Sequence, residues 1–235
     1  MRNQHPLQDP RRSENIIIIG TGESAAVALD YLNYDTPHKV VGFSTEKEYL
    51  DSDAYCGLPA VPLDNISDAY PPGMHKAFVP VSPTGLNRLR RRLFDTVKAA
   101  GFTCISYVSS HAFVLPSVTI GENVFIQENT ALQYMTSVGD NVFLGSGSCV
   151  GHSSVIKEDC YIGPNASIAG NCRIGRSCFI GVNSTISNTV SVAEDCVIGA
   201  GAVVLKNTEP RHVYLGNPAR PTGRDSFDTW PARSN

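Results

Sequence analysis

The sequence predicts a small α/β domain followed by a parallel β-helix of hexapeptide repeats. Two observations support this. Seventeen consecutive positions spaced six residues apart are all aliphatic, with no slip in register. The hundred residues before these repeats lack that period and alternate short apolar runs with helical stretches. Since an internal repeat outweighs any local signal, the hexads decide the architecture of the larger part of the chain.

The first part of the chain predicts a Rossmann-like βαβ sheet. Residues 1–14 are polar, and we expect them to form a loosely ordered arm. The domain then occupies residues 15–107, and its alternation of strands and helices indicates a parallel sheet, about half of a dinucleotide-binding fold. The expected strands are 15–20, 39–43, 76–82 and 103–108, and the expected helices are 21–35 and 83–101.

The turn after the first expected strand is a candidate nucleotide site. Gly20 and Gly22 open the first helix, where the backbone can approach a ligand and free N–H groups can meet a phosphate. Glu46 lies just past the second strand, where a ribose hydroxyl would be held. Alternatively, the glycines only allow the helix and strand to pack closely. The sheet is too short for a full NAD site, so redox chemistry is not expected.

The hexads occupy residues 108–208 and predict about five triangular coils, each made of three short strands. A period of six fits neither a helix nor an alternating strand, but it fits a chain that turns a third of a circle per repeat. We expect the aliphatic residues to point inward, small residues four positions later to line the corners, and the frequent glycine after the aliphatic residue to ease the bend. Residues 209–235 leave the pattern and are expected to cap the coils. A β-sandwich is the alternative, but its strands would alternate with period two. The repeated aliphatic residues are Val108, Val114, Ile120, Ile126, Leu132, Val138, Leu144, Val150, Ile156, Ile162, Ile168, Ile174, Ile180, Ile186, Val192, Ile198 and Val204.

Composition excludes several classes of function. The net charge of −3 and the absence of a basic run with aromatics argue against nucleic-acid binding. No apolar stretch is long enough to span a membrane. The seven cysteines form no CxxC pair, and four of them fall on small inner hexad positions, which predicts a reduced, cytoplasmic setting.

His152 is the histidine that lies deep in the repeats, and it is the candidate catalytic base. It follows the inward Val150 by two positions, so its side chain should leave the coil outward among small residues. One coil of 18 residues further on is Gly170, whose N–H should stand beside the imidazole with no side chain between. A base beside an N–H donor suits acyl transfer, because the base deprotonates the attacking group and the donor stabilises the oxyanion.

The βαβ start, the hexads, "VGHSSVI" and the ending "GAGAVVLKNTEPRHVYLGNPAR" resemble sugar O- and N-acetyltransferases of the sialic acid, bacillosamine and perosamine type. The resemblance covers about residues 15–220. It implies a left-handed β-helix, a homotrimer with active sites between neighbouring coils, acetyl-CoA as acyl donor, no metal, and a sugar or nucleotide-sugar acceptor held partly by the N-terminal domain. It implies that His152 is the base, that Gly170 meets the acetyl carbonyl, that Gly20 and Gly22 hold the nucleotide sugar, and that CoA lies beside Gly199, Ala200, Gly201 and Lys206.

Two positions depart from the family pattern. The acidic residue that follows the histidine in relatives is Ser153 here, so the imidazole needs another partner, such as a backbone carbonyl or Glu158. A second histidine of the bacillosamine enzyme aligns with Tyr161, a candidate substrate contact, and the acidic pair after the second strand reads Ser44 and Thr45, followed by Glu46. The missing acid favours an amino sugar over a hydroxyl acceptor, because a neutral amine can attack with less help from a base than a hydroxyl needs.

Four other functions remain for comparison. Sugar O-acetylation differs only in the acceptor atom. A non-catalytic scaffold that binds a sugar nucleotide would bind without turnover. A γ-type carbonic anhydrase needs three zinc-binding histidines, and His111 and His152 are too few. A sugar-nucleotide pyrophosphorylase would need a far larger N-terminal domain.

Overall fold

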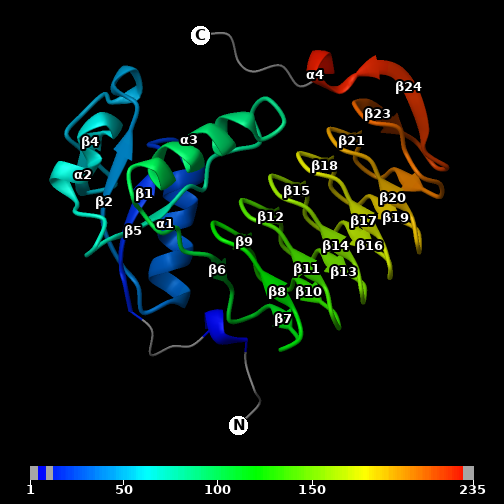
Figure 1. Cartoon of the computed structure of the whole chain (residues 1–235), viewed down its shortest axis with the longest axis horizontal. Coiled ribbons are helices and arrows are strands. Elements are labelled where there is room, and N and C mark those ends of the chain that lie inside the picture. The colour runs from blue at the N-terminus through cyan, green and yellow to red at the C-terminus, as the bar shows by residue number, and fades with distance from the viewer. Residues whose placement is uncertain (1–4, 9–12, 230–235) are drawn as a thin grey trace.

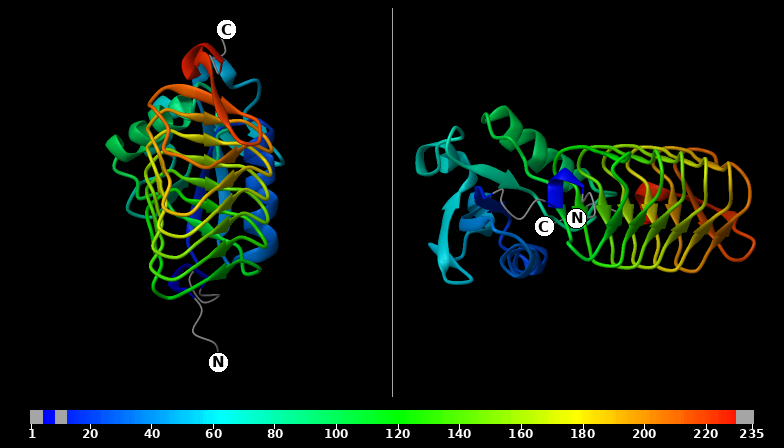
Figure 2. Two further views of the ribbon diagram at one scale, coloured as in Figure 1. Left: turned by 90° about the vertical axis from the view of Figure 1, so that its right-hand side faces the viewer. Right: turned by 90° about the horizontal axis from the view of Figure 1, so that it is seen from below.

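A computed structural model describes residues 5–8 and 13–229 and shows two parts (Figure 1). An N-terminal α/β domain lies beside the first turns of a long column of coils, and a C-terminal segment covers the far end of that column (Figure 2). The predicted fold class is confirmed: a small parallel sheet leads into a left-handed β-helix of hexapeptide repeats. Within the described residues, no helix is long and apolar enough to cross a membrane.

The N-terminal domain is a five-stranded sheet in the order β3-β4-β2-β1-β5, in which only β3 is antiparallel. The interior strand β1 contains four consecutive isoleucines because both faces of the sheet are covered. Ile16 and Ile18 pack with α1, whereas Ile17 and Ile19 pack with α3. The elements are β1 (Asn15–Ile19), α1 (Glu23–Asp35), β2 (Lys39–Thr45), β3 (Ala54–Tyr55), β4 (Leu58–Pro62), α2 (Ile66–Ala69), β5 (Lys76–Phe78) and α3 (Arg88–Ala99), with short 3-10 turns at Pro6–Gln8, Lys47–Tyr49 and Leu63–Asn65.

The β-helix is a triangular column whose strands repeat every 18 residues. We call its three sheets the first, second and third face, in chain order. The first face holds β6 (Tyr107–Val108), β9 (Phe125–Ile126), β12 (Phe143–Leu144), β15 (Tyr161–Ile162), β18 (Phe179–Ile180) and β21 (Val197–Ile198), continued by β23 (His212–Leu215) and β24 (Arg220–Asp225). The second face holds β7 (Phe113–Val114), β10 (Ala131–Leu132), β13 (Cys149–Val150), β16 (Ser167–Ile168), β19 (Thr185–Ile186) and β22 (Val203–Val204). The third face holds β8 (Thr119–Ile120), β11 (Ser137–Val138), β14 (Val155–Ile156), β17 (Arg173–Ile174) and β20 (Ser191–Val192).

The inward ladder predicted from the hexads is present. Of the 17 aliphatic residues, all but Ile120 are buried, and Ile120 packs partly buried against the same core. The small inner residues, including Cys160, Cys172, Cys178 and Cys196, are buried and unpaired. Each coil therefore contributes its own apolar layer, and the strand spacing of about 4.8 Å lets successive layers stack.

The corners bend differently from the prediction. The glycines after the aliphatic residue do not supply a left-handed backbone. They instead allow coils to approach, since a Cβ at Gly139 would lie 2.7 Å from the Glu158 nitrogen. The left-handed residue comes two positions later, where Asn, Asp and Gly tolerate positive φ best. These corner residues are Asn123, Asn129, Met135, Asn141, Gly147, Ser153, Asp159, Asn165, Asn171, Ser177, Asn183, Thr189, Asp195 and Gly201.

Three edges separate the faces, and each is named by the faces it joins. Edge 1/2 contains residues 127–130 and their equivalents in other coils, edge 2/3 contains residues 133–136, and edge 3/1 contains residues 139–142. The expected strand at 103–108 splits at this junction. Tyr107 and Val108 form β6 of the first face, while Cys104 makes only an isolated bridge to Ala77 of the N-terminal sheet.

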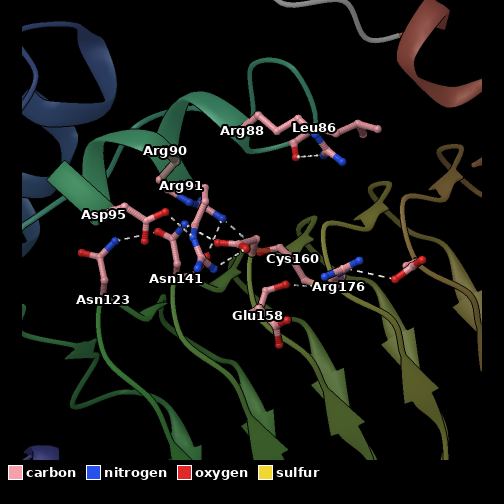
Figure 3. A network of polar contacts seen from close by, with 12 residues as sticks. Leu86, Arg88, Arg90, Arg91, Asp95, Asn123, Asn141, Glu158, Cys160 and Arg176 are labelled. Atoms are coloured by element: carbon pink, nitrogen blue, oxygen red, sulfur yellow. Dashed lines mark hydrogen bonds and ion pairs between the residues drawn. The ribbon is translucent and has the colours of Figure 1, made fainter. Parts of the chain in front are cut away.

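Helix α3 joins the two parts by lying along edge 3/1 (Figure 3). Its ends form ion pairs with distant coils, Arg88 with Asp195 and Lys98 with Glu122. Between them, Arg90 is buried and donates to the carbonyl oxygens of Asn141 (2.8 Å) and Cys160 (3.1 Å). The N-terminal domain is thus fixed to the column over most of its length.

Both ends of the column are capped. At the base, Leu7 packs against the apolar core and His5 is buried beside the Val118 carbonyl. These residues depart from the loose arm expected for 1–14, of which residues 1–4 and 9–12 lie outside the described residues. At the far end, β23 pairs with β21, β24 covers β23, and α4 (Ser226–Thr229) follows. The tail with Trp230 lies outside the described residues.

Acidification is expected to weaken the base cap. Burial lowers the pKa of His5, so as pH falls below about 6.5 the unfolded chain binds a proton before the folded chain does. The contribution of His5 to the free energy of unfolding should therefore be fully present above that pH and should decrease as the pH falls below it. A His5→Gln variant should show a flatter dependence in urea unfolding between about pH 7 and pH 5. Parallel curves for the two proteins would contradict this role of His5.

Candidate active site

His152 stands on edge 2/3, just after β13, with its side chain exposed as predicted. Its backbone is fixed on both sides. The His152 N–H donates to Gln133 Oε1 (3.2 Å), and the His152 carbonyl accepts from the Asn171 N–H (2.9 Å). The left-handed Ser153 then turns the chain into the third face, and its N–H donates to the Tyr134 carbonyl (2.8 Å). The imidazole is thus presented to solvent from a rigid corner.

Gly170 lies against the imidazole, which also agrees with the prediction. A Cβ added at Gly170 would lie 2.7 Å from His152 Nε2 and 3.0 Å from Cε1. Only glycine leaves room for the ring in this position. Across the part of the chain that the structure describes, the Gly170 N–H donates to no acceptor. A free donor beside an exposed base is the arrangement that acyl transfer requires.

The structure does not supply the orienting acid that the sequence left open. Glu158 lies on edge 3/1, one third of a turn away from His152, so it is wrong as a partner for this imidazole. Six residues after His152 carry the chain across the whole third face. Among the described residues, no side chain or carbonyl forms a hydrogen bond with the ring.

The candidate CoA residues fall on two different edges. Lys206 is exposed on edge 2/3, three coils above His152 in the same column of corner positions. Gly199, Ala200 and Gly201 lie on edge 1/2 of the last coil, where the Gly199 N–H donates to the Tyr214 carbonyl (2.9 Å). The second face separates these two groups within one chain.

The glycine turn of the N-terminal domain lies at the carboxyl ends of β1 and β2. Gly20 has a φ of +106°, which only glycine adopts without strain, and its N–H donates to the Ser44 carbonyl (2.7 Å). Gly22 precedes α1 with open space where a Cβ would project. The turn is therefore open to a ligand at the edge of the sheet, as expected for a nucleotide site.

Glu46 lies at the same edge, but its carboxylate is already paired. Arg92 of α3 donates to both of its oxygens, at 2.5 and 3.0 Å. This two-point contact holds the pKa of Glu46 below its usual value. No pattern in the sequence indicates this pair, because the two residues are 46 positions apart on different elements.

Tyr161 lies apart from the other candidates. It sits on the outer side of the first face, stacked between Phe143 (centroids 4.6 Å apart) and Phe179 (5.1 Å). The first face is opposite edge 2/3 in a three-sided column, so Tyr161 cannot reach His152 of its own chain. Its place in this stack gives it a packing role within the chain.

Two neighbours of His152 were not predicted. Gln133 holds the His152 backbone, as described above, and Tyr134 occupies the same corner position one coil lower. Tyr134 and Met135 are large, apolar and exposed, at 58% and 57%. The coil period of 18 residues could have identified Tyr134, because it lies one period before His152 just as Gly170 lies one period after it.

Comparisons with known proteins agree with this architecture. The bacterial transferase hexapeptide family (six repeats) matches residues 135–170 and 171–206. No curated protein sequence matches the chain. Among solved structures, a histidine-to-asparagine mutant of perosamine N-acetyltransferase from Caulobacter crescentus, in complex with CoA and GDP-perosamine, is 26% identical with a TM-score of 0.78, over 89% of this chain and 97% of that chain.

Two further structures share the fold. The acetyltransferase domain of PglB from Neisseria gonorrhoeae FA1090 is 23% identical with a TM-score of 0.77, over 88% of this chain and 99% of that one. WeeI from Acinetobacter baumannii AYE is 21% identical with a TM-score of 0.75, over 89% and 100%. The resemblance to hexapeptide-repeat sugar acetyltransferases, made on sequence motifs, is confirmed by the repeat match and by these whole-chain likenesses.

Proposed function

We propose that this chain, an acetyl-CoA-dependent acetyltransferase of the hexapeptide-repeat type, acetylates an amino group of a nucleotide-linked sugar. The observation that carries the proposal is the exposed imidazole of His152 packed on Gly170, whose N–H is free among the described residues. The likeness to a perosamine N-acetyltransferase bound to CoA and GDP-perosamine supports both the donor and the class of acceptor.

Each step of the transfer has a group on edge 2/3. The neutral amine of the sugar attacks the thioester carbonyl of acetyl-CoA, and His152 takes the proton that the nitrogen loses. The Gly170 N–H donates to the oxyanion that forms on the carbonyl oxygen. The carbon–sulfur bond then breaks, the sulfur of CoA leaves, and the imidazolium returns its proton to it. The products are the N-acetylated sugar and CoA.

An amine acceptor is favoured by the missing partner of the imidazole. In the described residues, no carboxylate contacts the ring of His152, and Ser153 stands where relatives carry an acid. Such a ring has no carboxylate partner to orient it for removing a proton from a weakly acidic hydroxyl. A sugar amine is partly neutral near pH 7 to 8 and needs less help than a hydroxyl.

The placement of the candidate residues supports a homotrimer with shared sites. Lys206 lies on one free edge and Gly199 to Gly201 on another, at the same coil level. Where edge 2/3 of one copy meets edge 1/2 of the next, one CoA molecule can lie between the two groups. The predicted trimer gives that arrangement. The cytoplasmic location stays a prediction, resting on unpaired cysteines.

The test is release of CoA from acetyl-CoA, followed with a thiol reagent across a panel of amino and hydroxyl nucleotide sugars. Release that requires an amino sugar would support the proposal. Release with hydroxyl sugars alone would assign O-acetylation instead. Binding of a nucleotide sugar without any release from the panel would favour a scaffold.

Gly170→Ala is expected to lower kcat about a hundredfold while leaving the fold intact. The new methyl group would lie 2.7 Å from His152 Nε2, so the imidazole must move by a substantial part of an ångström. Displacement of that order can cost a factor of about 10² in rate. The thermal midpoint should change little, since the ring is exposed and can swing outward.

The control is the same substitution in a His152→Ala background. Because Gly170→Ala acts by moving the ring, it should then have little further effect on the residual rate. A full hundredfold loss in that background would show that Gly170 acts through something other than the imidazole.

A further inference from the structure

A cavity of about 340 Å³ lies at the base of the column, between the end of α1 and edge 1/2. Its walls are aromatic and acidic, formed chiefly by Tyr31, Tyr34, Asp35, Tyr107 and Glu128. Both carboxylates are held ionised, because hydrogen bonds lower the pKa of Asp35 and of Glu128. The phosphates of CoA and of a nucleotide sugar are anionic, so the acidic wall of this cavity does not favour binding of those groups.

The cavity has an exposed aromatic rim rather than a closed one. Tyr34 is 80% exposed, and Tyr31 donates to Glu128 Oε2 (2.7 Å) at the back. Asp35 accepts from Tyr107 Oη (2.7 Å) and from the Ser110 N–H (2.7 Å). These bonds fix the end of α1 on the first coils and keep the cavity in shape.

Two of the three edges are free of α3 and can meet another copy of the chain. At the base of edge 1/2, the end of α1 is bound to the first coils and forms part of the cavity wall. Edge 3/1 is covered by α3 from Glu122 to Asp195, and the first face carries the N-terminal domain at its base, with Phe125 in that domain's core. Figure 1 shows the second face on the side of the column away from that domain. In a closed ring with parallel columns, each copy touches its neighbours through the two edges that flank its inward face. Only the second face has both flanking edges free of α3.

We infer that this cavity is the socket for Tyr134 of a second copy. The proposal rests on the homotrimer proposed above. With parallel columns and the second face inward, edge 2/3 of one copy meets edge 1/2 of the next at equal coil levels. Tyr134 lies six positions after Glu128, hence on the next edge of the same coil, so the ring places the two opposite each other. An aromatic ring enters a tyrosine-lined wall in edge-to-face contact, and its hydroxyl can donate to a carboxylate.

Charge and exposure agree with this pairing. Edge 2/3 carries His152 and Lys206 and no acidic residue between 115 and 208, whereas Glu128 is the acid of edge 1/2. Tyr134 and Met135 would lose their exposure to water in the contact. The three-fold rotation of the proposed trimer also brings Gly199 to Gly201 of one copy beside Lys206 of the next. One interface therefore accounts for both the exposed Tyr134 and the separation of the candidate CoA residues.

The first test measures the mass of the protein in solution. Tyr134→Glu places a third carboxylate against Asp35 and Glu128 and should convert the trimer to monomer. Tyr134→Phe keeps the ring and should stay trimeric, as should Met74→Glu, which changes an exposed residue of the N-terminal domain. A trimeric Tyr134→Glu protein would overturn the socket.

The second test is cross-linking by a short bismaleimide. Tyr34→Cys and Tyr134→Cys are combined in a chain whose exposed Cys56 and half-exposed Cys149 are serine. The pair should give covalent dimers and trimers, while either cysteine alone and the distant pair Ser52→Cys with Tyr134→Cys should not. An intact trimer without cross-links from the first pair would overturn the proposal. Neither test depends on turnover, so acetyl transfer by a monomeric wild type would refute the socket and leave the proposed chemistry standing.

Discussion

His152→Ala is expected to lower kcat/KM for acetyl transfer by a factor of about 10² to 10⁴, the range that a general base contributes. The imidazole is exposed on edge 2/3 and packs only on Gly170 and its own corner, so its removal should leave the column folded. The loss should therefore appear in the rate of CoA release and not in the thermal midpoint.

Two companions make the result specific. His152→Gln keeps a polar side chain that cannot act as a base near neutral pH, and it should be as impaired as the alanine variant. Asn188→Ala changes the corner position two coils above His152 in the same column and should keep most of the activity. If wild type and His152→Ala release CoA equally fast with the active acceptor, another group is the base.

The pH dependence of the wild-type rate gives an independent check. If the imidazole acts as base, kcat/KM should have an ascending limb with pH that depends on His152, because only a deprotonated base can accept the proton. In His152→Ala that limb should disappear. A limb of unchanged position in the variant would assign it to the acceptor amine, whose protonated form cannot attack.

The column could be predicted from sequence because its information is local. Each coil is specified by an inward aliphatic residue every six positions, and every such residue meets only its own layer and the two beside it. The same locality predicted that His152 and Gly170 lie side by side, because residues 18 positions apart are neighbours in adjacent coils. The repeated Asn and Asp residues also indicate left-handed corners in the sequence. The prediction assigned the bend to the glycines instead, because they follow the aliphatic residues so regularly.

The short elements of the N-terminal domain and the partners of α3 could not be predicted, because they depend on contacts between distant segments. The strands β3 and β4 and the helix α2 are short and lie in a stretch rich in proline and turn residues, where no period marks them. The three arginines at positions 90 to 92 of α3 read as one basic helix in the sequence. In the fold each binds different groups. Arg90 donates to carbonyl oxygens of two coils. Arg91 binds one carboxylate of the column and one of α3, and Arg92 binds Glu46 just after β2.

The largest effect on stability is expected from Asp159→Ala. Asp159 occupies a left-handed corner of edge 3/1, where its side chain is 7% exposed. It accepts from Asn141 Nδ2 (2.7 Å) and from Arg91 Nη1 (2.9 Å), and Asn141 accepts in turn from Asn123 (2.8 Å). Figure 3 shows Asn123 and Asn141 of this ladder below Arg90, which donates to the Asn141 carbonyl.

Arg90 makes the carboxylate important. Burial lowers the pKa of the Arg90 guanidinium to about 10, and the nearby Asp159 carboxylate opposes that effect. Without Asp159, the fully buried cation keeps two carbonyl contacts and loses its countercharge, while Asn141 and Arg91 each lose an acceptor. Leaving a buried cation without its nearby countercharge in this way costs up to about 3 to 5 kcal/mol.

The expected result is a fall in the free energy of unfolding of about that size, measured in urea, for Asp159→Ala. Asp95→Ala is the matched control, because it removes the other carboxylate bound to Arg91, in an exposed pair worth at most about 1 kcal/mol. The double variant Arg90→Met with Asp159→Ala should be less destabilised than the sum of the two single variants, since it leaves no uncompensated buried charge. Strict additivity would mean that Arg90 and Asp159 do not interact and that α3 is held on the column by its apolar contacts and its end pairs alone.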